Sequence, residues 1–278
     1  MNAMVPVRAL FVVATAAIAA VLGGAASADD ASPWISDSHS AVRLLAGSRS
    51  GAVLLGGIAF ELQPGWKTYW RTPGDSGVPP RFDFSKSDNI DAITILWPAP
   101  TAFDDGAGGH SFGYKKHVVL PLRIVAKNAD KPVTLRAKID YAVCERLCVP
   151  VEADPELAFV SVASTQDGAL SAALDTVPKP AKVGDANPVT IRDVKRNGGE
   201  VWVDVVAPDV AQVSLFVEGP TPEWALPAPK LLEVGPDGVK RFGFALDGLP
   251  PGAHAEGAAL KLTLVGPGRS YEFNVNLN

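Results

Sequence analysis

The chain has 278 residues, with 25 basic and 30 acidic side chains that give a formal net charge of −5. These charges are spread along the sequence without a basic block, which argues against nucleic acid as a partner. Hydrophobic residues make up 47% of the chain, enough to build packed cores without stabilisation by its two cysteines.

The N-terminal residues 1–28 have the features of a secretory signal peptide. Arg8 precedes an apolar run at 9–22, and the small residues Ala26-Ser27-Ala28 stand before Asp29. The run is shorter than the ~20 residues that a bilayer span needs, so cleavage near Asp29 is favoured over an uncleaved anchor. No later segment reaches ~18 consecutive apolar residues, so we expect a soluble protein in the periplasm.

The first half of the mature chain, residues 29–165, contains short apolar runs separated by Gly and Pro. This spacing is typical of a β-sandwich or barrel. With 24 Pro and 26 Gly in the chain, long helices have little room, because Pro ends them and Gly weakens them. The predicted strands are 42–46, 53–62, 93–97, 117–125, 133–143 and 156–162.

One short helix is predicted at 167–176, where Leu170 and Leu174 share a face and Pro178 ends the turn. We expect it to cover one end of the first domain. The Pro- and Gly-rich sequence that follows completes a helix and linker region at 166–187.

Strand-like runs resume in residues 188–278, near positions 189, 201, 213, 239, 260 and 271, and predict a second β-sandwich. This half has no cysteine and a single histidine, His254. Nothing in it suggests chemistry.

The two cysteines follow a predicted half-buried strand. Odd positions of 133–143 are mostly apolar and even positions are polar up to 140, so Cys144 is expected on the polar face. The residues 145–147 suit a three-residue hairpin loop that returns through Cys148. Cross-strand neighbours have Cα separations of ~4.5 to 5.5 Å, which permit a disulfide.

The disulfide could be structural or redox-active. A disulfide that closes a loop of about five residues stabilises the folded state by only ~2 kcal/mol, against more than about 4 kcal/mol for a loop of roughly a hundred residues. A bridge between residues farther apart in sequence would therefore stabilise the protein more. A disulfide at a hairpin tip is also within reach of a partner thiolate. Zinc would need further ligands, while Cu(I) on the two thiolates stays open, although Met1 and Met4 lie in the signal peptide. A tandem binding or assembly module with an inert disulfide is the other alternative.

Three stretches, 65–71, 97–100 and 141–150, together resemble the N-terminal periplasmic domain of DsbD-type thiol:disulfide interchange proteins. The similarity covers roughly residues 41–162 and is closest to the branch of copper-sensitivity suppressor proteins. It implies that the first domain is an immunoglobulin-like β-sandwich. Together with the second sandwich predicted at 188–278, the expected fold is all-β, with two tandem immunoglobulin-like β-sandwiches. The similarity also implies electron relay from a membrane-embedded thiol reductase to periplasmic disulfide isomerases and thioredoxin-like proteins, including those of cytochrome maturation, without a cofactor or bound metal.

The resemblance implies roles for individual residues. Cys148 would be the attacking thiol that forms mixed disulfides, and Cys144 the resolving thiol. A cap loop would span 103–114, with either Phe103 or Phe112 as the capping aromatic, although an ordinary Gly-rich surface loop is equally compatible. The other flanking positions are Asp104, Asp105 and Tyr114 in the loop, and Trp66 and Tyr69, which would form an apolar floor or simply pack in the core.

The resemblance also implies a difference in architecture. Full-length members continue into a transmembrane reductase and a thioredoxin-like domain, whereas this chain continues into a second sandwich. We therefore expect the reductase to be a separate polypeptide. The direction of electron flow stays open, since an oxidant, a scavenger of mixed disulfides or a copper-stress protein would carry the same motif.

Overall fold

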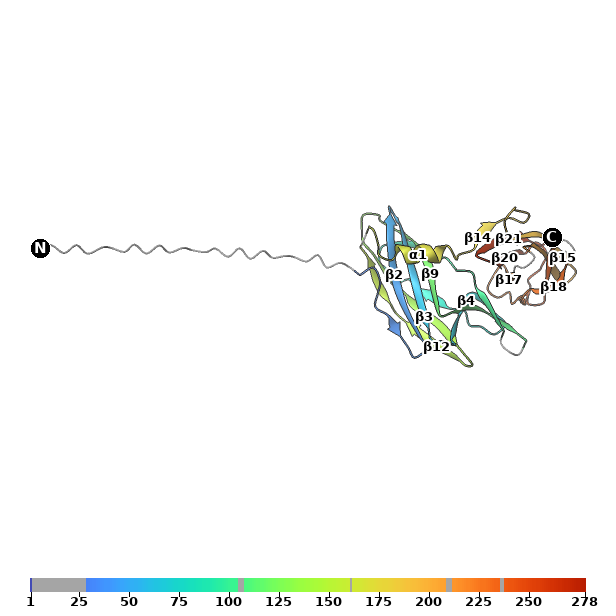
Figure 1. Cartoon of the computed structure of the whole chain (residues 1–278), viewed down its shortest axis with the longest axis horizontal. Coiled ribbons are helices and arrows are strands. Elements are labelled where there is room, and N and C mark those ends of the chain that lie inside the picture. The colour runs from blue at the N-terminus through green and yellow to red at the C-terminus, as the bar shows by residue number, and fades with distance from the viewer. Residues whose placement is uncertain (2–28, 105–107, 161, 209–211, 236–237) are drawn as a thin grey trace.

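The computed structural model describes residues 1, 29–104, 108–160, 162–208, 212–235 and 238–278. Within these ranges the chain is almost entirely β, with α1 (Asp167–Leu174) as the one α-helix. The strands form two β bodies that lie side by side (Figure 1). The expectation of an all-β fold with one short helix is confirmed. The predicted signal peptide lies outside the described residues, apart from Met1.

The first body is built on two larger sheets. One has the strand order β1-β2-β3-β9-β6, in which every neighbouring pair is antiparallel. Its longest strand pair, β2 with β3, matches two of the predicted runs. The strands are β1 (Ile35–Ser36), β2 (Ser40–Ser50), β3 (Val53–Leu62), β9 (His117–Ala126) and β6 (Ile90–Ile95).

The other sheet of this body carries both cysteines. Its order is β12-β11-β4-β8-β7, and β5 pairs with β11. A two-stranded sheet of β10 and β13 accompanies it. The strands are β12 (Cys148–Ala153), β11 (Lys138–Cys144), β4 (Lys67–Gly74), β8 (His110–Lys115), β7 (Thr101–Asp104), β5 (Arg81–Asp83), β10 (Val133–Arg136) and β13 (Glu156–Phe159).

The strand predicted at 133–143 is in fact two strands. It breaks at Ala137, after which the chain moves from the β10–β13 pair to the sheet of β11. The odd positions from Val133 to Val143 nevertheless all stay buried. Side chains alternate between the two faces of a strand. If this alternation continues without a shift while the chain passes from one sheet to the next, the odd-numbered residues keep facing the core. The alternation therefore predicts the buried face, but it cannot reveal a change of sheet.

Helix α1 packs on the outer face of the first sheet. Leu170 and Ala173 are its buried residues, and Leu170 joins a small cluster with Leu45 and Val119. A Cβ at Gly57 would come within 2.7 Å of Leu170, so this glycine makes room for the helix. The helix therefore covers a sheet face rather than one end of the body, and its buried spacing is three residues rather than the predicted four.

The second body consists of two four-stranded sheets, ordered β14-β21-β20-β17 and β15-β16-β19-β18. The predicted linker contains one of these strands, because Lys179–Ala181 pairs in parallel with β21. The strands are β14 (Lys179–Ala181), β15 (Thr190–Asn197), β16 (Glu200–Val206), β17 (Ser214–Glu218), β18 (Lys230–Val234), β19 (Lys240–Ala245), β20 (Ala259–Gly266) and β21 (Arg269–Asn276).

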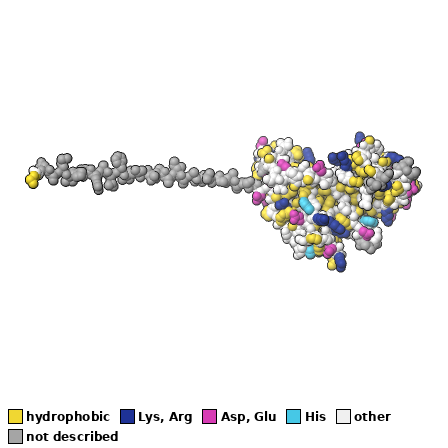
Figure 2. Space-filling model, in the orientation of Figure 1, with side chains coloured by type: hydrophobic (Ala, Val, Ile, Leu, Met, Phe, Trp, Pro, Cys, Tyr) yellow, Lys and Arg dark blue, Asp and Glu magenta, His cyan; other side chains and the backbone are white. Residues whose placement is uncertain are grey.

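Each body has its own buried core, but a buried side chain of the second body belongs to the core of the first, and Ala228 and Val265 of the second body pack against that core. Phe216 of β17 is 1% exposed and belongs to the core of the first body, with Trp70 and Phe112. On the face drawn in Figure 2, Lys and Arg side chains are interspersed with acidic ones. The two bodies are thus joined by buried contacts as well as by the chain.

Candidate functional site

The two cysteines form a disulfide at the end of the β11–β12 hairpin. Cys144 and Cys148 are the last paired residues of the two strands, and their Cα atoms lie 4.2 Å apart. The residues 145–147 form the loop at the tip, as the sequence predicts. Six residue pairs, from Ile139 with Ala153 to the cysteines, hold β12 against β11.

The two sulfur-bearing residues differ sharply in exposure. Cys144 is 3% exposed, whereas Cys148 is exposed, as are Leu147 at 80% and Val149 at 36%. Sequence parity placed Cys144 on the polar face of its strand. It does lie opposite the core face, but that face is covered here, since Cys144 packs with Tyr69 and Ala142. A partner thiolate can therefore approach Cys148 beside exposed apolar side chains.

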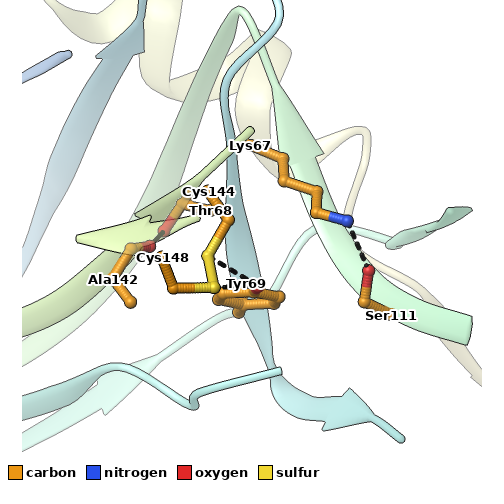
Figure 3. Close-up of a disulfide and its surroundings, with 7 residues drawn as sticks. All are labelled: Lys67, Thr68, Tyr69, Ser111, Ala142, Cys144 and Cys148. Atoms are coloured by element: carbon orange, nitrogen blue, oxygen red, sulfur yellow. Dashed lines mark hydrogen bonds between the residues drawn. A yellow bond between two sulfur atoms is a disulfide. The ribbon is translucent and has the colours of Figure 1, made fainter. Parts of the chain in front are cut away.

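Tyr69 of β4 contacts both sulfur atoms. Its hydroxyl donates a hydrogen bond to Cys144 Sγ at 2.8 Å and lies 3.3 Å from Cys148 Sγ (Figure 3). Burial raises the pKa of this phenol above its usual value, because the charged form would lose its hydration. The hydroxyl thus stays protonated at neutral pH and is a permanent donor to sulfur.

The backbone around Tyr69 is held tightly. The Thr68 hydroxyl donates to the carbonyl of Ala142 at 3.0 Å, which links β4 to the strand of the first cysteine. On the other side, Gly113 pairs with Tyr69, and a Cβ at Gly113 would lie 1.9 Å from the carbonyl oxygen of Thr68. Only glycine fits this close approach of two strands.

Two lysines, on strands β4 and β8, lie in the same cross-strand row as the cysteines. Lys67 pairs with Cys144, and Lys115 pairs with Lys67, so their side chains leave the same face. The Lys67 ammonium donates to Ser111 Oγ at 2.8 Å (Figure 3), and both ammonium groups lie over the Phe103 ring, at 5.5 and 4.5 Å from its centroid. The Lys67 ammonium is therefore directed towards Ser111 and away from the two sulfur atoms (Figure 3).

The predicted cap loop at 103–114 is largely a hairpin. Strands β7 and β8 pair from Thr101 with Gly113 to Asp104 with His110. Asp105 lies outside the described residues. Phe112 is 5% exposed in the core, so it is not available to cover the disulfide, whereas Phe103 lies on the sheet face of the cysteines.

The remaining predicted flanking residues make their contacts with other groups than the sulfur atoms. Trp66 stacks on His39 with ring centroids 3.7 Å apart and packs against the first core. Tyr114 is buried and donates to the carbonyl of Pro98 at 2.8 Å. Asp104 is exposed and pairs with His110 in the hairpin. The structure therefore brings Tyr69, but not these three, to the disulfide.

Strand periodicity could have separated these residues in advance. In a strand, Lys67 and Tyr69 share one face, whereas Thr68 and Trp70 share the other. Trp66 and Tyr69 differ by three positions, so alternation argues against a common aromatic floor. Lys67 and Lys115 cannot be assigned to the site from local sequence, because their position relative to the cysteines depends on pairing between strands far apart in sequence.

Two general features of the described residues bear on function. No group of three or more His, Cys, Asp or Glu side chains among them could hold a metal ion. In the same ranges, no helix combines the length and apolar character needed to cross a membrane.

Comparison with known proteins points to one family. Residues 41–159 match the family model described as thiol:disulfide interchange protein DsbD, N-terminal. No curated protein sequence matches the chain. The structure is similar to the N-terminal periplasmic domain of ScsB from Proteus mirabilis, with a TM-score of 0.73 and 22% identity over 90% of this chain and 99% of that one, which indicates a shared fold. The reduced DsbD N-terminal domain of Neisseria meningitidis aligns with 15% identity over 42% of this chain and 83% of that one, at a TM-score of 0.28.

Proposed function

Because residues 41–159 form a DsbD-type N-terminal domain, we propose that this chain is a periplasmic thiol–disulfide exchange protein. It carries electrons between a membrane-embedded thiol reductase, acting in trans, and thioredoxin-like or disulfide isomerase proteins of the periplasm. The observation that carries this proposal is the asymmetry of the pair. Cys148 is open to a partner, while Cys144 is buried beneath a hydroxyl that donates to its sulfur.

The exchange would proceed in two displacement steps. In the reduced protein, the Cys148 thiolate attacks a sulfur of the partner disulfide, so that a mixed disulfide forms and one partner thiolate leaves. The Cys144 thiolate then attacks Cys148 Sγ, which releases the second partner thiolate and forms the Cys144–Cys148 disulfide. Two electrons pass from this protein to the partner, and a thiol reductant restores the pair by the reverse sequence.

Tyr69 assists the step in which Cys144 is the leaving group. When a reductant thiolate attacks Cys148, negative charge develops on Cys144 Sγ, 2.8 Å from the Tyr69 hydroxyl. Hydrogen bonds to a charged acceptor are roughly twice as strong as neutral ones, so the donor helps most as the bond breaks. Lys67 and Lys115 add positive charge on the same sheet face.

A purely structural role fits the site less well. The closed loop is about five residues long, so the bridge constrains the unfolded chain little. The hairpin is also held by five residue pairs besides the cysteines. The disulfide is therefore not needed to set the register of β12, which supports a role in exchange.

Trapping of mixed disulfides tests the proposal and the two roles. Cys144→Ser expressed in a native envelope should accumulate covalent complexes through Cys148, because the resolving thiol is missing. Cys148→Ser should accumulate none, and a variant with both substitutions controls for non-covalent capture. Non-reducing gels and mass spectrometry identify the partner. Complexes on Cys144 in the Cys148→Ser variant would reverse the roles.

A redox titration separates exchange from an inert bridge. Structural disulfides of exported proteins have potentials below about −300 mV, and exchanging ones are more oxidising. We expect the Cys144–Cys148 pair to equilibrate with a glutathione buffer. A pair that stays oxidised throughout, together with failure to trap any complex, would instead favour a binding or assembly module. Metal uptake lost on substitution of either cysteine would favour Cu(I) binding by the reduced pair.

A further inference from the structure

Strand β4 connects the disulfide to the second body. Tyr69 reaches the sulfur atoms, and the residues that follow it leave the regular pairing with β8. Between the pairs Tyr69 with Gly113 and Gly74 with Ser111, four residues of β4 lie opposite a single residue of β8. Such a bulge bends the strand and turns its side chains in new directions. Three residues of this bulge, Trp70, Arg71 and Thr72, contact the second body.

A cluster of charged groups binds the bulge to β17 and β21. The Arg71 guanidinium donates to both carboxylate oxygens of Glu218, at 2.8 and 2.7 Å, and to Glu272 at 2.7 Å. Thr72 Oγ1 donates to the same Glu218 at 2.8 Å. The three charged side chains are 22%, 14% and 23% exposed, so the network is largely shielded from water. Bidentate pairs of this kind fix geometry as well as charge.

An aromatic cluster lies next to this network. Phe216 of the second body contacts Trp70 of the bulge and Phe112 of β8, with ring centroids 5.8 and 4.8 Å apart. The Arg71 guanidinium lies 4.5 Å from the Trp70 ring centroid. The second body therefore contacts both β4, the strand of Tyr69, and its neighbour β8.

The position of Tyr69 depends on both ends of its strand segment. On one side, the Thr68 hydroxyl attaches β4 to Ala142. On the other side, the bulge lacks regular pairing with β8, and its polar anchors are Arg71 and Thr72 on Glu218. A small rotation of the bulge would move the Tyr69 hydroxyl, whose hydrogen bond to sulfur is sensitive to distance and angle.

We propose that Arg71 is a positioning residue for thiol–disulfide exchange. By binding Glu218 and Glu272 of the second body, it holds the β4 bulge so that the Tyr69 hydroxyl stays on Cys144 Sγ. The second body thereby acts as a buttress for the redox site of the first. This inference rests on the proposed exchange function of the cysteine pair.

A double-mutant cycle on the full mature chain tests the proposal. Arg71→Met removes the ion pairs and keeps an aliphatic side chain. Because Tyr69 stabilises the reduced sulfur more than the disulfide, we expect the equilibrium with glutathione to shift towards the disulfide by about threefold to tenfold, where tenfold corresponds to about 30 mV. Tyr69→Phe should give a similar shift, and adding Arg71→Met to it should change the equilibrium little further.

Matched variants separate positioning from general destabilisation. Arg241 binds Asp204 and Glu233 at 2.7 Å within the second body, so Arg241→Met breaks a comparable network far from β4 in sequence and should leave the equilibrium unchanged. Glu218→Gln should reproduce part of the Arg71→Met effect. If Arg71→Met fails to fold, Glu218→Gln takes its place in the cycle.

The outcomes are distinguishable. An unchanged equilibrium in Arg71→Met, or an equal shift with and without the Tyr69 hydroxyl, would overturn the positioning role and leave the exchange function intact. A wild-type pair that does not equilibrate with glutathione at all would instead contradict the proposed function. A shift that depends on Tyr69, with no shift in Arg241→Met, supports the buttress.

Discussion

At the scale of single residues, the tyrosines show how burial and hydrogen bonding define the chemistry around the disulfide. Tyr69 donates to sulfur, and Tyr141, three residues before the first cysteine, exchanges a hydrogen bond with Ser40 at 2.8 Å. Tyr141 is 4% exposed and meets Phe60 edge to face. Both phenols lose hydration on folding, which favours their neutral forms.

The titration of Tyr141 predicts a loss of stability at alkaline pH. Burial raises its pKa to about 12. The unfolded phenol ionises near pH 10, so its contribution is fully present below that pH and is lost as pH rises towards 12, by at most ~1.4 kcal/mol per pH unit. Urea melts should therefore give a falling free energy of unfolding between pH 10 and 12.

Substitution of Tyr141 measures how much of the alkaline loss of stability is due to this residue. Tyr141→Phe should unfold more easily at neutral pH, because Ser40 loses one of its two hydrogen-bond partners, Tyr141 and Asp37. It should show a flatter decline in stability at alkaline pH. Ser40→Ala is the control, since it also removes the hydrogen bond to Tyr141, together with that of the Ser40 hydroxyl to Asp37, and leaves the phenol buried. An alkaline decline that is equally steep in Tyr141→Phe would assign it to other groups.

At the scale of elements, the β11–β12 hairpin holds its geometry without much help from the disulfide. Its six residue pairs define the register, and the closed loop is short. We predict that reduction lowers the free energy of unfolding by no more than about 2 kcal/mol. Urea melts with and without a thiol reductant measure this. The variant with both cysteines replaced by serine is the control, because reductant should not affect it, and a loss above ~4 kcal/mol would indicate a structural bridge.

Some elements could be predicted from sequence and others could not. The run at 53–62 coincides with β3 because apolar residues continue between a turn at Gly51 and a Pro-Gly break at 64–65. The hairpin of β7 and β8 does not follow from local sequence, since its glycines resemble those of a mobile loop. One of them, Gly113, instead allows β8 to approach Thr68 closely. Local sequence does not indicate which distant backbone a glycine will face.

The same limit applies to the candidate site. Local spacing placed the two cysteines at the end of a hairpin, and resemblance supplied Tyr69 as their neighbour. The contact of Lys67 with Ser111, and the joining of Arg71 to Glu218 and Glu272, depend on pairing between segments 44 to 201 positions apart. Such contacts follow from tertiary packing rather than from a local pattern.

At the scale of the whole molecule, Phe216 links the two bodies by buried contacts. It is 1% exposed and fills space between Trp70 and Phe112, while its strand belongs to the second body. We predict that Phe216→Ala costs about 3–5 kcal/mol, because a large cavity opens between the bodies. The contacts that Phe216→Ala removes are those between the two bodies. Calorimetry should therefore show one unfolding transition for the wild type and two for the variant.

A second phenylalanine distinguishes loss of coupling from loss of stability. Phe244 is 4% exposed in the core of the second body, so Phe244→Ala creates a cavity of the same chemistry away from the contact. Phe244→Ala should lower the melting temperature by weakening the second body. Any separation of the two unfolding transitions should be no larger than this weakening alone causes. If Phe216→Ala also keeps a single transition, the charged contacts of Arg71 suffice to couple the bodies. The combined Phe216→Ala and Arg71→Met variant should then be the one that separates them.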